Sequence, residues 1–256
     1  MEVMEICLAA TPQEYRETRR FPAIPAHVAY RIGPDGLLRQ DLPPGLRDGL
    51  LSLSDREAPT VKDPERLAAQ ILRECSQRGF RGIAADFERP PSTDRIALLR
   101  ALVRRCGKHL QVFVPESCAV EGASVLINTA VSGGSLAERL REAIQCHPGA
   151  SLDLQRLMMD FTLPAPSGEG KPLTAEELAE LRRRHGPSVF FSPELCARYF
   201  TYRDGKQVHF VLFDDAGTLQ QKMRMAESLG YRAALMMYPE VRDIAEQLFP
   251  AAKSRR

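Results

Sequence analysis

Tryptophan is absent from this chain of 256 residues, and so are long apolar runs, C-x-x-C pairs and a strong net charge. No apolar stretch approaches the roughly 20 residues of a membrane-spanning helix. The N-terminus has acids where a signal peptide has a basic region. The formal net charge is only +2, with Lys and Arg scattered along the chain. We therefore expect neither a membrane nor nucleic acid as a partner.

The six cysteines show no paired spacing and no spacing with histidine of the kind that binds zinc. Most fall in predicted helices or strands, where a free cysteine behaves as a small apolar residue. A reduced, cytoplasmic compartment is the resulting expectation, with no metal and no cofactor. The Gly-rich dinucleotide fingerprint and the phosphate loop are also missing. No spacing supports a Ser-His-Asp or Cys-His constellation.

What is present is the composition of a globular protein, with 44% hydrophobic and 27% charged residues. Outside one hairpin, eight segments have strand patterns, namely 3–9, 26–31, 49–53, 79–88, 110–114, 125–130, 152–161 and 231–238. Most are followed by a helix pattern. The clearest helix begins at the N-cap signature Asp63-Pro64-Glu65 and ends at Gly79.

Alternating strands and helices with short connections predict an α/β fold with a parallel sheet. Eight such units in a chain of this length favour closure into a single (β/α)8 TIM barrel, with one domain over 1–256. Two strand patterns joined by Asp204-Gly205 predict a β-hairpin, within a small insertion at about 188–215. The residues 251–256 are expected to form a frayed tail.

Two acids close the strand pattern of residues 79–88. Side chains two apart on a strand share a face, so Asp86 and Glu88 point the same way. Because barrel enzymes place their active sites at the carboxyl ends of the strands, these acids are the candidate catalytic residues. The alternative is a solvated acidic strand end, or one paired with Arg81 or Arg89.

The same rule selects polar residues at other strand ends. The predicted substrate-binding residues are Tyr30, Glu116, Asn128, Asp160 and Tyr238. Two of them, Glu116 and Asp160, fit a surface loop nearly as well. The pair Asp214-Asp215 has a simpler explanation as a helix N-cap.

Residues 81–88 resemble the D-G-x-D-x-D-x-E signature of family 18 glycoside hydrolases, the chitinase-like group, and match it at Gly82, Asp86 and Glu88. The resemblance is closest to the branch that contains spore-cortex peptidoglycan glucosaminidases. It extends through an early strand and turn at 30–36 and a late strand, acidic pair and helix at 208–222.

The resemblance implies a TIM barrel and a substrate-assisted, retaining hydrolysis, in which the substrate's own N-acetyl oxygen is the nucleophile. It implies that Glu88 is the proton donor to the glycosidic oxygen. Asp86 would then raise the pKa of that donor and orient the acetamido group. The implied partners are carbohydrates, namely N-acetylhexosamine polymers or their fragments.

Several positions depart from the family pattern. Arg81 and Ala84 replace two acids of the signature. The strand expected to carry a Met-x-Tyr pattern reads Leu-Ile-Asn at 126–128, and the usual final Trp is Tyr238 at best. The departures favour an alternative, a barrel that has lost hydrolysis and serves as a carbohydrate-binding or protein-interaction module. An ion-paired Glu88 under a collapsed barrel mouth would support that alternative, and an open cleft would support the enzyme.

Overall fold

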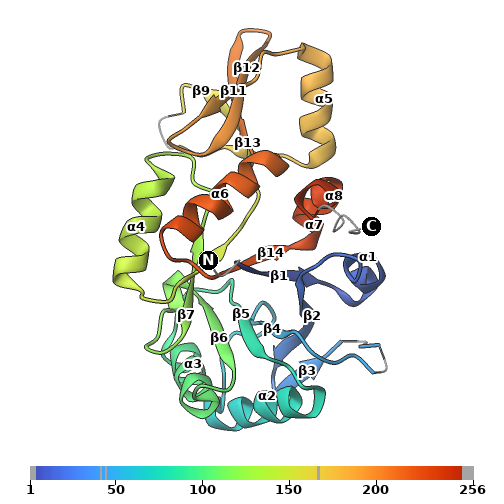
Figure 1. The fold of residues 1–256 in the computed structure, drawn as a ribbon, viewed down its shortest axis with the longest axis vertical. Coiled ribbons are helices and arrows are strands. Elements are labelled where there is room, and N and C mark those ends of the chain that lie inside the picture. The colour runs from blue at the N-terminus through green and yellow to red at the C-terminus, as the bar shows by residue number, and fades with distance from the viewer. Residues whose placement is uncertain (1–3, 41, 44, 166–167, 250–256) are drawn as a thin grey trace, which may run out of the picture.

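Eight parallel strands close into a barrel in the computed structural model, which describes residues 4–40, 42–43, 45–165 and 168–249 (Figure 1). The strands are β1 (Glu5–Ala10), β2 (Ile24–Gly33), β4 (Leu50–Ser54), β5 (Gly82–Asp86), β6 (Gln111–Pro115), β7 (Ser124–Asn128), β8 (Ser151–Asp153) and β14 (Ala233–Met237). Their order is β1-β14-β8-β7-β6-β5-β4-β2, and β1 pairs with β2 to complete the ring. The predicted α/β TIM barrel is confirmed. Val3 and the predicted tail at 251–256 lie outside the described residues.

Helices surround the barrel as the local signals predict (Figure 1). The longer ones are α2 (Pro64–Arg78), α3 (Thr93–Cys106), α4 (Leu136–Cys146) and α6 (Ala216–Ser228), and short ones are α1 (Tyr15–Thr18), α7 (Tyr238–Val241) and α8 (Ala245–Leu248). At the start of α2, the Asp63 side chain accepts the N–H of Arg66 at 3.0 Å. Gly79 ends the helix with a φ of 66°, a conformation that strains residues with a Cβ.

The barrel strands alternate between two apolar layers. Small side chains such as Ala9, Ala26 and Ala84 pack with Phe113 inside the barrel. Their chain neighbours face outward and form the larger layer under the helices. This alternation turns the last inward positions of the strands toward the barrel mouth.

An antiparallel sheet is inserted between β8 and α6. It consists of β9 (Met158–Leu163), β10 (Lys171–Pro172), β11 (Phe190–Ser192), β12 (Ala197–Asp204) and β13 (Gln207–Phe213), and α5 (Ala175–His185) packs on one face. The hairpin of β12 and β13 is the predicted one. The predicted strand 152–161 is divided into β8 and β9, so the inserted sheet begins earlier in the chain than expected. No Gly or Pro marks that division in the sequence.

A buried ion pair fastens the insertion to the barrel. Lys222 of α6 donates to Asp214 at 2.8 Å and to the carbonyl of Thr129 at 3.0 Å, and both charged side chains are fully buried. Asp214 also accepts the N–H of Leu157 at 2.9 Å. The two chain crossings, at Leu157 and Asp214, are thus tied together. The neighbouring Asp215 caps α6, as the N-cap interpretation of this pair expects.

The six cysteines are all unpaired, and Cys146 is the exposed one. Among the residues that the structure describes, no helix is long and apolar enough to cross a membrane.

Candidate active site

A hollow of about 330 Å³ opens at the carboxyl ends of the barrel strands, and we call it the mouth hollow. Its polar lining comes from Ser52, Asp86, Glu88, Glu116, Ser117, Asn128, Asp153 and Gln155. Apolar side chains of β7 and β14, including Leu126 and Met237, complete the wall. The barrel mouth is therefore open and lined with acids, as the enzyme interpretation requires.

A second hollow of about 280 Å³ adjoins the first, and the two share Asp86, Glu88 and Met237. The shared residues place the predicted acid pair at the junction of a longer groove. Such a groove can accommodate sugar units on both sides of that junction.

Asp86 is the last residue of β5 and lies beside Ser54 of β4. Its carboxyl is largely removed from water, and this burial raises its pKa. The negative charge of Glu88 raises the pKa further, whereas Arg56 acts in the opposite direction. Asp86 therefore keeps its proton to a higher pH than an ordinary aspartic acid.

Glu88 lies at the rim of the mouth hollow, with 46% of its side chain exposed. Both carboxylate oxygens accept hydrogen bonds from Arg56, at 3.0 Å from Nε and 2.7 Å from Nη2. A bidentate pair of this kind is a charge-assisted contact with a fixed geometry. Glu88 is thus ion-paired, as the non-catalytic interpretation expects. It also stands beside an open hollow, as the enzyme interpretation expects.

The arginines expected beside Glu88 lie elsewhere. Arg81 pairs with Asp48, and Arg89 donates to the carbonyl of Arg56 at 2.8 Å. The backbone N–H of Glu88 donates to Asp55 at 2.9 Å. Because β4 and β5 are paired, the residues after each strand meet, and this long-range pairing brings Arg56 to Glu88.

Asp55 fixes the backbone below this rim. It is fully buried and accepts a hydrogen bond from Arg95 Nε of α3 at 2.6 Å, with Arg95 only 4% exposed. The remaining oxygen accepts the N–H of Glu88. Asp55 thus holds the chain after β5 in place.

Asp153 closes β8 and is a site residue that the sequence did not reveal. Its Oδ2 accepts a hydrogen bond from Gln155 Nε2 at 2.8 Å. The pKa of Asp153 is raised to about 7, mainly by burial and further by the charges of Glu240 and Asp86. The signal was the end of the apolar run at Leu152, which was obscured because 152–161 was interpreted as one strand.

Two predicted substrate-binding residues, Glu116 and Asn128, do line the mouth hollow. Glu116 follows β6 and is ion-paired with Arg139 of α4. Asn128 closes β7 and donates from Nδ2 to Gln155 Oε1 at 2.8 Å. Both lie with Asp86 and Glu88, as the strand-end rule predicts.

Tyr30 lies with its ring outside the mouth. Its side chain is only 1% exposed, and its hydroxyl donates to Glu74 of α2 at 3.0 Å. The pairing of β2 with β4 shifts by one residue between Val28 and Tyr30. This irregularity turns the ring outward, although Tyr30 still reaches the margin of the second hollow.

Asp160 and Tyr238 also lie away from the mouth hollow. Asp160 belongs to β9 of the inserted sheet, where it accepts from the hydroxyl of Tyr202 at 2.6 Å. Tyr238 begins α7, and its hydroxyl donates to Glu17 at 2.8 Å. Because Met237 points inward, its neighbour Tyr238 points outward.

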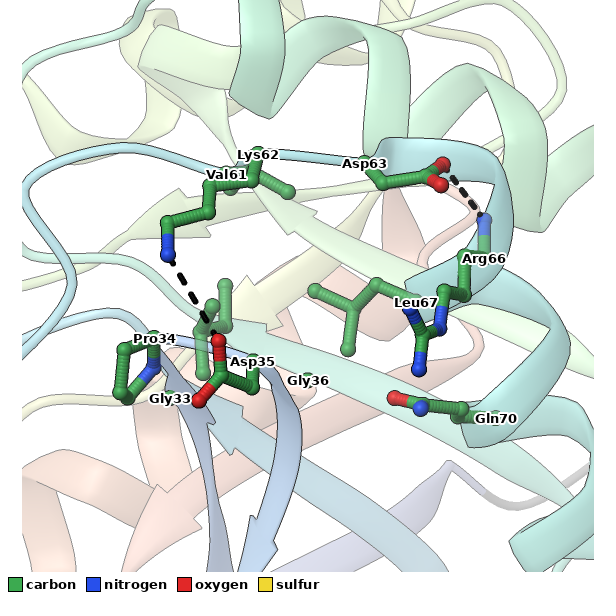
Figure 2. Close-up of a pocket in the computed structure, with 11 residues that line it drawn as sticks. Gly33, Pro34, Asp35, Gly36, Val61, Lys62, Asp63, Arg66, Leu67 and Gln70 are labelled. Atoms are coloured by element: carbon green, nitrogen blue, oxygen red, sulfur yellow. Dashed lines mark hydrogen bonds and ion pairs between the residues drawn. The ribbon is translucent and has the colours of Figure 1, made fainter.

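Figure 2 shows a smaller crevice of about 110 Å³ between the turn after β2 and the start of α2. Lys62 and Asp35 point toward each other across it, with Nζ and Oδ1 3.6 Å apart, and both side chains are exposed. Its remaining acid, Asp63, serves as the N-cap of α2. The mouth hollow therefore remains the candidate active site. Over the described residues, no group of three or more His, Cys, Asp or Glu is placed to hold a metal ion.

No protein-family model matches this chain, and no curated protein was found to match it. Several solved structures do. The spore cortex-lytic enzyme SleL of Bacillus cereus is similar, with a TM-score of 0.69, 17% identity and coverage of 99% of this chain and 76% of that one.

A family 18 N-acetylglucosaminidase from Paenibacillus barengoltzii has a TM-score of 0.69 and 13% identity, with 97% of this chain and 98% of that one covered. A family 18 chitinase from Cycas revoluta in complex with (GlcNAc)4 has a TM-score of 0.63 and 14% identity, with 95% and 97% covered. The resemblance drawn from the sequence is thereby confirmed at the level of the fold.

Proposed function

We propose that this chain is a glycoside hydrolase that binds N-acetylhexosamine-containing glycans in the mouth hollow and cleaves them by substrate-assisted, retaining hydrolysis. The observation that carries the proposal is the open groove at the barrel mouth, with the half-buried carboxyl of Asp86 at the junction of its two hollows. The names of the similar enzymes, which include an N-acetylglucosaminidase and a chitinase bound to (GlcNAc)4, support this substrate class.

Substrate-assisted hydrolysis requires two things from the protein. One group must protonate the leaving oxygen, and another must hold the acetamido group against the anomeric carbon. Asp86 suits the second role because it lies at the junction of the two hollows. A carboxyl group of the same groove supplies the proton, and the resemblance to family 18 implies Glu88 for that role.

The test is hydrolysis of aryl glycosides of N-acetylglucosamine and chitobiose and of short chitin and peptidoglycan oligosaccharides. We expect turnover of the N-acetylated substrates and none of the matching aryl glucoside, which lacks the nucleophile. Asp86→Asn should lower kcat by about 10²-fold or more. Asp35→Ala, in the crevice of Figure 2, is the matched control and should leave kcat unchanged.

Binding of oligosaccharides without turnover of any of these substrates would contradict the proposal. That result would favour the carbohydrate-binding module, the interpretation to which the Glu88–Arg56 ion pair points. The anomer first released, followed by proton NMR, separates retention from inversion.

A further inference from the structure

Another hollow, of about 220 Å³, lies on the outside of the barrel between α1 and the strands β1 and β2, and we call it the outer hollow. Figure 1 shows α1 beside these two strands. The walls come from Leu8 of β1, from α1 and the start of β2, and from Leu46 and Arg47 before β4. The outer hollow shares no lining residue with the mouth hollow. The proposed hydrolysis therefore makes no use of it.

Two buried polar groups line the outer hollow without a hydrogen-bond partner among the described residues. They are the hydroxyl of Tyr15 and Nδ1 of His27, in residues that are 6% and 2% exposed. The two rings meet edge to face, with their centroids 5.1 Å apart. A buried polar group without a partner costs free energy, so each one in a native fold needs an explanation. Two of them in one hollow call for a polar group from outside the chain.

The surroundings of these two atoms determine their hydrogen-bonding roles. His27 Nε2 lies 2.9 Å from the backbone carbonyl of Asp48, which can only accept, so Nε2 carries a hydrogen. Burial lowers the pKa of His27, which leaves the ring neutral at pH 7 and makes Nδ1 an acceptor. Burial also raises the pKa of Tyr15, so its hydroxyl keeps its proton and can donate. A hydroxyl group of a ligand would match both atoms.

Much of the remaining wall is apolar. Leu8, Phe21 and Leu46 are buried residues that line the outer hollow. An apolar cavity of about 150 Å³ is large enough to bind benzene, so the outer hollow has room for a six-membered aromatic ring. A free sugar would place several hydroxyl groups against these apolar side chains, where they would lose their hydrogen bonds to water. The walls therefore favour a ring that carries few polar groups.

Two exposed arginines at the rim give the outer hollow a positive charge. Arg19 has no ion pair with any described residue, and Arg47 donates to the carbonyl of Gln77 at 2.9 Å, which leaves its charge unneutralised. Asp48, the next residue in the chain, pairs instead with Arg81. An anionic group at the outer end of a ligand would thus meet positive charge.

We propose that the outer hollow binds a small aromatic acid with a hydroxyl group on the opposite side of the ring. The hydroxyl donates to His27 Nδ1 and accepts from the Tyr15 hydroxyl. The ring packs against the apolar walls, and the carboxylate lies at the rim beside Arg19. The probe for this class is 4-hydroxybenzoate, which has all three features. The site is separate from the proposed hydrolysis and does not depend on it.

Isothermal titration calorimetry on the full chain tests the chemistry of the ligand. We expect 4-hydroxybenzoate to bind with a Kd of about 1 mM or below. Two relatives should each bind about tenfold or more weakly, namely 4-methylbenzoate, which lacks the hydroxyl, and 4-methylphenol, which lacks the carboxylate. Equal affinity for all three compounds, or no binding of 4-hydroxybenzoate, would overturn the proposal and leave water as the partner of the two polar groups.

Substitutions test where the probe binds. Tyr15→Phe removes the unpartnered hydroxyl and keeps the ring, so it should weaken binding of 4-hydroxybenzoate about tenfold. Arg19→Met should weaken binding of both carboxylates and leave that of 4-methylphenol unchanged. Arg16→Met is the matched control, because Arg16 is also exposed on α1 but does not line the outer hollow. Unchanged affinity in Tyr15→Phe would place the probe elsewhere and overturn the proposal.

Two further measurements separate a ligand site from a structural role. The Tm of the free Tyr15→Phe variant should not fall, because no partner loses a hydrogen bond. A lower Tm would show that the hydroxyl has a structural bond, and would contradict the proposal. Chitotetraose should not displace 4-hydroxybenzoate, since the two hollows share no lining residue. Displacement would assign the probe to the mouth hollow and would contradict the proposal as well.

Discussion

Asp153 and Glu88 lie at the same barrel mouth, yet their surroundings differ. The side chain of Glu88 is almost half exposed to solvent, and both of its carboxylate oxygens accept hydrogen bonds from Arg56. Asp153 is surrounded by apolar walls and by the acids Asp86 and Glu240. The environment of each carboxyl group, more than its residue type, decides what it can do in a reaction.

Stability should fall with rising pH because of Asp153. Its pKa is raised to about 7 in the folded chain from an ordinary value near 3.8. Between these values the folded chain holds a proton that the unfolded chain has released, so the free energy of unfolding decreases as pH rises. At about 1.4 kcal/mol per pKa unit, the loss by pH 8 is roughly 2–4 kcal/mol.

Asp153→Asn should therefore be more stable than the unmutated chain at pH 8 and similar to it at pH 4. Urea unfolding across this pH range measures the difference. Glu180→Gln, at an exposed ion pair on α5, should leave the pH dependence unchanged. Equal pH dependence in the Asp153→Asn variant and the unmutated chain would show that Asp153 titrates normally.

The sequence predicts the position of those side chains that follow simple strand periodicity. Asp86 and Asn128 end barrel strands, Glu88 and Glu116 follow barrel strands closely, and all four reach the mouth hollow. Tyr30 does not, because the one-residue shift beside it depends on pairing with a strand about twenty residues away. No local pattern encodes such a shift.

Elements with local signals are predictable, and those that depend on distant partners are not. The cap at Asp63 and the glycine at 79 delimit α2 where the sequence places them. The strand β3 (Gly36–Arg39) was not predicted, because it forms only against β2. The division between β8 and β9 is likewise a tertiary effect, since the chain leaves the barrel there to pair with β13.

Lys222→Met should destabilise the junction between barrel and insertion. It leaves Asp214 buried and without its cation, a change that costs about 3–5 kcal/mol. Asp214→Asn combined with Lys222→Met should recover part of this loss, because no uncompensated charge remains. Denaturant unfolding of the two variants gives the coupling between the residues.

Lys171→Met is the control for this pair. Lys171 also pairs with an acid, Glu177, but its side chain is 69% exposed. Loss of an exposed pair should leave the free energy of unfolding nearly unchanged. If the two lysine variants lose equal stability, burial of the Lys222 pair is not what makes it important.

The whole molecule contains separate apolar cores. The barrel has its interior and the layer under its helices, and the inserted sheet has a core of its own beneath α5. Figure 1 shows α5 beside the strands of the inserted sheet. Polar contacts at the two chain crossings, including those of Asp214, join the parts. The insertion therefore adds a structured body beside the mouth, while the barrel alone supplies the acids of the mouth hollow.

Because the barrel and the inserted sheet have separate cores, we expect each to unfold locally without the other. Phe200→Ala in the inserted sheet and Phe113→Ala in the barrel are a matched pair, since the first ring is fully buried and the second 3% exposed. Each should cost about 3–5 kcal/mol. By native-state hydrogen exchange, Phe200→Ala should reduce amide protection in β12 and β13 and leave β4 and β5 unchanged. Phe113→Ala should reduce protection throughout the barrel strands. A uniform loss in Phe200→Ala would show instead that the polar contacts at the crossings bind insertion and barrel into one cooperative unit.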